Sequence, residues 1–68
     1  MKLQINGIIK TFESESITLD KLIDQLGYNS KIIVVEYNGF IISSNEWNKK
    51  AVYDGDKIEI VTIVGGGS

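Results

Sequence analysis

The chain has 68 residues, 43% hydrophobic and 24% charged, which is enough for one globular domain near the lower size limit of a stable core. It contains no cysteine, histidine or arginine, which excludes disulfides, thiolate metal sites and the commonest general base. A net charge of −2 argues against nucleic acid as a partner, and the composition favours a carrier or binding module over an enzyme.

The N-terminal segment predicts a β-hairpin. Residues 2–6 alternate between apolar and polar side chains, as a half-buried strand does. Asn6-Gly7 is typical of a type I′ turn, in which both central residues need a positive φ. The returning strand is expected over residues 8–13, with Phe12 facing the core.

Polar residues 13–16 are expected to connect this hairpin to an amphipathic helix. Thr18 has the chemistry of an N-cap, and Gly27 falls where a left-handed glycine closes a helix. The apolar residues between them recur at helical spacing: Leu19, Leu22, Ile23 and Leu26. A helix with one such stripe must pack against a sheet.

A second hairpin follows the helix. Residues 32–35 are β-branched with little alternation, which is typical of an inner strand, and Tyr37 continues it. Asn38-Gly39 is a second type I′ signal and leads into a strand over residues 40–42.

Two shorter features precede the last strand. Ser44 is expected to cap a turn over residues 45–47, with Trp47 as a lid on the open end of the core. The acidic turn 54–56 carries two carboxylates, but its Asp-Gly-Asp composition suits a tight turn and no third ligand is near, so no metal site is expected.

The last strand is expected over residues 57–64, with Ile58 and Ile60 facing inward. It most simply lies between the hairpins and parallel to the first strand. The fold class is therefore α+β: a β-grasp (ubiquitin-like) roll with a mixed five-stranded sheet curled round one main helix. We expect residues 1–64 to form the domain and residues 65–68 a flexible glycine-rich tail.

The tail has two interpretations. Gly65, Gly66 and Gly67 have no side chain to pack and lose the most backbone entropy on ordering, so they suit a floppy terminus or an expression scar. The alternative is a tail that is threaded into the active site of another protein, through a channel too narrow for a Cβ atom.

The end of the chain resembles that of the ThiS sulfur-carrier proteins of thiamin biosynthesis. The likeness lies in the turn and strand 54–61 followed by residues 63–67, with support from the hairpin 35–39 and the pair Glu46-Trp47. The small subunit of molybdopterin synthase shares the fold and a Gly-Gly end but is usually longer, and it is the alternative within the superfamily.

The resemblance implies chemistry performed on this protein by others. A ThiF-like adenylating enzyme, using ATP and Mg²⁺, would activate the carboxyl group of Gly67, with Gly65 and Gly66 as the threading tail. A persulfide sulfur donor would convert it to a thiocarboxylate, which would deliver sulfur to thiazole synthase. Ser68 departs from the pattern: either it is a remnant of processing or expression, or the printed chain is a precursor or blocked form.

We expect partners to dock on the sheet face away from the helix, where Phe40, Val61 and Ile63 are candidates for an exposed apolar patch. The alternative for Phe40 is a half-buried edge position. No signal peptide or membrane-spanning run is evident, so we expect a cytoplasmic protein, monomeric alone, with no bound cofactor, catalytic residue or membrane partner. A noncovalent ubiquitin-like interaction module is the alternative function.

Overall fold

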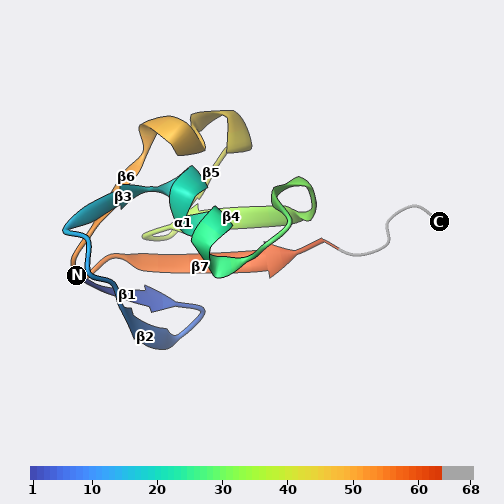
Figure 1. Cartoon of the computed structure of the whole chain (residues 1–68). Coiled ribbons are helices and arrows are strands. Elements are labelled where there is room, and N and C mark those ends of the chain that lie inside the picture. The colour runs from blue at the N-terminus through green and yellow to red at the C-terminus, as the bar shows by residue number, and fades with distance from the viewer. Residues whose placement is uncertain (64–68) are drawn as a thin grey trace.

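The computed structural model describes residues 1–63 (Figure 1). Its elements are β1 (Lys2–Ile5), β2 (Ile8–Thr11), β3 (Ser16–Thr18), α1 (Leu19–Leu26), η1 (Ser30–Ile32), β4 (Ile33–Tyr37), β5 (Phe40–Ile42), η2 (Ser44–Lys49), β6 (Ala51–Tyr53) and β7 (Lys57–Thr62). The main sheet has the order β2-β1-β7-β4-β5, and β3 pairs with β6 in a separate ladder. This confirms the predicted mixed five-stranded sheet and its one main helix. The predicted domain boundary after residue 64 lies outside the described residues.

Both hairpins turn at the predicted Asn-Gly pairs. Asn6 and Asn38 have φ values of 50° and 48°, and the glycine after each also has a positive φ. This left-handed pair is the type I′ geometry, whose twist matches that of the flanking strands. Between the hairpins, β7 runs parallel to β1 and antiparallel to β4, so the last strand is central, as expected.

The helix packs its apolar stripe against the sheet. It ends at Gly27, whose φ of 82° allows its N–H to donate to the Asp24 carbonyl, as the C-terminal signal predicted. Thr18 precedes the helix as expected, but its side chain makes no capping hydrogen bond. The buried core residues are Leu3, Ile5, Leu19, Leu22, Ile23, Ile33, Val35, Trp47, Val52, Ile58 and Ile60.

Two aromatic residues confirm their predicted places. Phe12 is partly buried against the core. Trp47 is only 4% exposed, and its Nε1 donates to the Ile42 carbonyl over 2.9 Å, so its one polar group is satisfied where the ring closes the core.

Several predicted boundaries and caps were wrong. The strand that returns from the first turn ends at Thr11 and not at residue 13. The predicted connector over residues 13–16 stops one residue early, because Ser16 begins β3, an unpredicted strand that pairs with β6 through Ile17 and Val52. Ser44 does not cap the short helix η2: it is the first residue, and the capping position belongs to Ser43, whose side chain makes no capping bond. The last strand ends at Thr62, earlier than expected. Three-residue strands are too short to show a period, which is why the β3–β6 ladder left no signal.

Candidate functional site

The residues predicted to carry the chemistry, Gly65, Gly66 and Gly67, lie outside the described part of the chain. The observable part of the site is therefore the end of β7, from which the chain continues toward them. Figure 1 shows β7 running through the middle of the sheet and ending at the side of the molecule opposite the N-terminus.

Hydrogen bonds hold the end of β7 from both sides. On the β4 side Val61 lies opposite Val34, and the Ile63 N–H donates to the Ile32 carbonyl over 2.6 Å. On the β1 side the pairing ends with Ile5 opposite Ile58. Beyond that pair, the Asn6 side chain takes over. Its Oδ1 accepts from the Ile60 N–H over 2.6 Å, and its Nδ2 donates to the Ile60 carbonyl over 3.1 Å.

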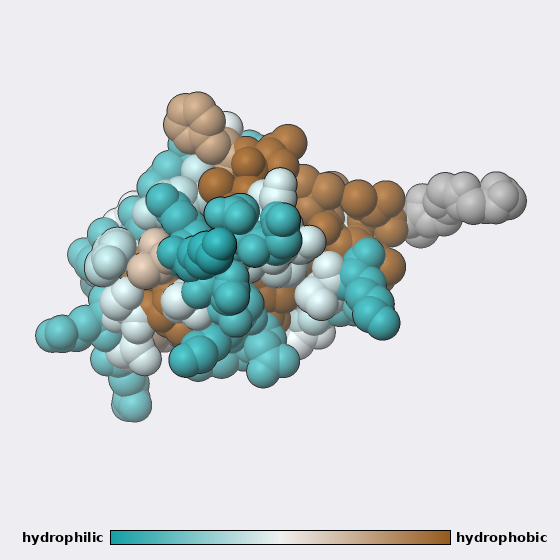
Figure 2. Space-filling model, turned by 90° about the horizontal axis from the view of Figure 1, so that it is seen from above, coloured by the Kyte–Doolittle hydropathy of each residue, from teal (hydrophilic) through white to brown (hydrophobic). Residues whose placement is uncertain are grey.

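An apolar patch borders this end of the strand. Val61 and Ile63 are each 55% exposed. Val61 shares its face with Val34, because opposed residues of an antiparallel pair point to the same side, and this face is away from the buried Ile60. Ile41, 69% exposed, lies on the same face, opposite Glu36. Figure 2 shows hydrophobic surface gathered next to the point where the described chain ends.

Phe40 does not belong to this patch, which corrects the prediction. It lies opposite Tyr37, which packs against the core and lies opposite Ile58 at the beginning of β7. Phe40 therefore shares the face of the core-directed residues, although it is 74% exposed. Ile41 is the residue of β5 that sequence reasoning missed. The signal was present, because a two-residue turn places Tyr37 opposite Phe40 and moves Ile41 to the other face.

The acidic turn, residues 54–56, has a structural role. Asp54 accepts the Lys2 N–H over 2.7 Å. Asp56 accepts three hydrogen bonds, from the Tyr37 hydroxyl at 2.6 Å, the Tyr53 N–H at 2.9 Å and the Asn38 amide at 3.3 Å. These bonds link the turn to the β4–β5 hairpin.

The same network shifts two pKa values. Burial alone would raise the pKa of the Asp56 carboxyl, but its hydrogen bonds and the charge of Lys50 lower it overall. The hydrogen bond to Asp56, together with burial, raises the pKa of Tyr37 to about 12. The Lys50 Nζ also lies 4.3 Å from the centre of the Tyr37 ring, in cation–π geometry.

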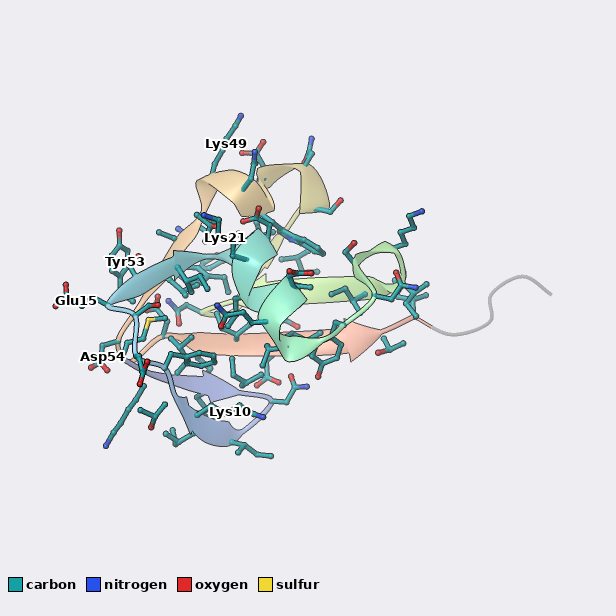
Figure 3. The ribbon with its side chains drawn as sticks, viewed as in Figure 1. Lys10, Glu15, Lys21, Lys49, Tyr53 and Asp54 are labelled. Atoms are coloured by element: carbon teal, nitrogen blue, oxygen red, sulfur yellow. The ribbon has the colours of Figure 1, made fainter. Side chains whose placement is uncertain are left out.

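This network is remote from the end of β7. Figure 3 places Tyr53 and Asp54 at the end of the body opposite the one where the described chain stops, and shows Lys49 pointing outward. Within residues 1–63 no group of three or more potential metal-ligating side chains comes together. No helix in that range has the length and apolar character needed to cross a bilayer.

Comparisons with known proteins agree with this geometry. The ThiS family model matches residues 3–67. The sulfur carrier protein ThiS of Bacillus subtilis is 35% identical over 65 residues, covering 96% of this chain and 98% of that protein. The crystal structure of the thiamine biosynthesis protein ThiS from Geobacter metallireducens superposes with a TM-score of 0.89 at 30% identity, covering 98% of this chain and all of that one.

A third relative is larger. Thiazole synthase of Paramagnetospirillum magneticum is 46% identical over 68 residues, which cover all of this chain but only 21% of that protein.

A mixed sheet curled round one helix, with the last strand at its centre, defines a ubiquitin-like β-grasp protein. Within that class, the chain belongs to the ThiS family, the sulfur carriers of thiamin biosynthesis. Membership of a carrier family confirms that the chain is not itself an enzyme. It also favours the thiamin pathway over the molybdopterin alternative.

Proposed function

We propose that this chain carries sulfur as a thiocarboxylate on Gly67, made and used by partner proteins. The observation that carries the proposal is the match to the ThiS family, which runs to Gly67 and stops before Ser68. The central position of β7 supports it, because hydrogen bonds from both neighbouring sides fix the last described strand, which directly precedes the glycines in the sequence.

The chemistry divides into three steps, all at the Gly67 carboxyl. A carboxylate oxygen attacks the α-phosphorus of ATP in an adenylating enzyme, which releases pyrophosphate and leaves an acyl-adenylate. The terminal sulfur of a persulfide then attacks the carbonyl carbon, and AMP leaves. A thiol cleaves the resulting acyl disulfide, which leaves the thiocarboxylate and a new disulfide.

Two features support the proposed partners. Val61 and Ile63 are exposed apolar residues at the end of the described chain, and Ile41 is exposed on the same face two strands away, which suits this face to docking on an enzyme that receives the tail. The relatives named thiazole synthase contain a segment similar to this chain within a longer polypeptide. That arrangement is consistent with thiazole synthase as the recipient of the sulfur.

Pyrophosphate release tests the proposal. A chain ending at Gly67 should release pyrophosphate from ATP when mixed with a ThiF-type adenylating enzyme, and the chain ending at Ser68 should not. Equal release from both forms, or from neither, would contradict activation at Gly67. Binding of the enzyme without any turnover of the Gly67 form would instead favour a noncovalent interaction module.

A further inference from the structure

The two Asn-Gly turns do more than reverse the chain, because each places an asparagine side chain against the backbone of β7. Asn38 Oδ1 accepts the Lys57 N–H over 2.8 Å, at the start of the strand. Asn6 binds both backbone groups of Ile60, near the end of the strand. A side-chain amide offers one acceptor and a donor group, as a peptide unit does. Asn6 therefore takes the place that a further residue of β1 would occupy.

Asn6 is also the last restraint of β7 on its β1 side. Within residues 1–63, no hydrogen bond joins Thr62 to any residue on that edge. Figure 1 shows β7 extending past the tip of the β1–β2 hairpin. Between Ile60 and Ile63, where the described chain ends, hydrogen bonds hold the strand from the β4 side alone, through the pairing of Val61 and Thr62 with β4 and the bond from the Ile63 N–H to the Ile32 carbonyl.

We propose that Asn6 is a positioning residue for the reactive tail. By binding the N–H and the carbonyl of Ile60, it holds the β1-side edge of β7 close to the end of the strand, and so limits the direction from which the tail enters an adenylating enzyme. This inference rests on the proposed function. Without Asn6, the end of β7 gains freedom that it must lose again on insertion. A reacting group misplaced by about 1 Å can slow a reaction by up to about 100-fold.

Asn6→Gly and Asn38→Gly form a matched pair for the test. Glycine keeps the positive φ of a type I′ turn, so both hairpins retain their turns, and each variant loses its side-chain bonds to one end of β7. Hydrogen exchange should become at least about fivefold faster at the Ile60 amide in Asn6→Gly, as loss of one hydrogen bond predicts. In Asn38→Gly the increase should fall on Lys57 instead.

The activity readout uses chains that end at Gly67. Asn6→Gly should lower kcat for adenylation about tenfold with KM within about twofold, because docking is intact and only the approach of the carboxyl group is altered. Asn38→Gly should leave kcat unchanged. Asn6→Asp keeps the acceptor for the Ile60 N–H and tolerates a positive φ, so it should restore part of the loss.

A wild-type kcat in Asn6→Gly, despite faster exchange at Ile60, would overturn the positioning role. So would an equal loss of kcat in both glycine variants, because that result would show a general effect of stability. If the unsubstituted Gly67 form is not adenylated at all, the proposed function fails, which is a distinguishable result.

Discussion

Replacing Asp56 by alanine tests whether the hydrogen bonds of the acidic turn stabilise the fold. The change removes the acceptor of three hydrogen bonds and leaves the Tyr37 hydroxyl and the Tyr53 N–H without it. Bonds to a charged acceptor contribute about 1.5–3 kcal/mol each, and less where the site is partly exposed. We expect a loss of about 2–3 kcal/mol in the free energy of unfolding. That is a large share of the roughly 3–10 kcal/mol expected for 68 residues.

Urea denaturation followed by the fluorescence of buried Trp47 measures this loss. A double-mutant cycle with Tyr37→Phe should give a coupling of about 1 kcal/mol, because the two side chains share a 2.6 Å bond. Asp24→Ala, at an exposed carboxylate on α1, is the control and should change stability by less than about 0.5 kcal/mol.

The pH dependence of the free energy of unfolding follows from the pKa shifts of Asp56 and Tyr37. The pKa of Asp56 is lowered on folding, so its contribution is present above the unfolded value of 3.8 and is lost as the pH falls through the folded value. The pKa of Tyr37 rises from 10.0 to about 12, so its contribution is present below pH 10.0 and is lost as the pH rises through about 12.

The difference in free energy of unfolding between the unsubstituted protein and Asp56→Ala should therefore become smaller in acid. The difference between the unsubstituted protein and Tyr37→Phe should become smaller in base. If Asp56→Ala lowers the free energy of unfolding at neutral pH by as little as Asp24→Ala does, the acidic turn does not stabilise the fold.

Three further predictions concern the core, the tail and the docking surface. Trp47→Ala should cost about 3–5 kcal/mol in unfolding free energy by circular dichroism, and Trp47→Phe clearly less; equal costs would contradict the packing role of the indole. Removing residues 65–68 should change stability by less than about 0.5 kcal/mol yet abolish pyrophosphate release, and retained release would exclude activation at Gly67. Ile63→Asp should leave urea denaturation unchanged and raise KM for adenylation of the Gly67 form, with Lys21→Asp on the helix as control. A normal KM would move the docking site elsewhere.

Local turn and cap chemistry explains why so much of the fold could be predicted from the sequence. Each Asn-Gly pair needs two positive φ values, which only a few residue types tolerate, and each one turned where expected. Gly27 ended the helix for the same reason. The central position of β7 followed from topology, because two hairpins and one helix leave a last strand few other places to pair.

The wrong sequence predictions concern features that tertiary contacts, and not local sequence patterns, determine. Val52 is fully buried and fixes the β3–β6 ladder, but one buried residue in three cannot establish a period. Phe40 was grouped with Val61 and Ile63 as a candidate for one apolar patch, although turn geometry pairs it with Tyr37 and places it on the other face. The hydrogen bonds between the Asn6 side chain and the Ile60 backbone join residues 54 positions apart, and no local sequence pattern predicts them.

The central claim is that sulfur is carried on the Gly67 carboxyl group, and intact mass measures this directly. A chain ending at Gly67, incubated with ATP, the adenylating enzyme and a persulfide donor with a reducing thiol, should gain the mass difference between one sulfur and one oxygen. Fragmentation should place that gain on the last residue. The same gain on the chain ending at Ser68, or a gain anywhere in residues 1–63, would contradict the account.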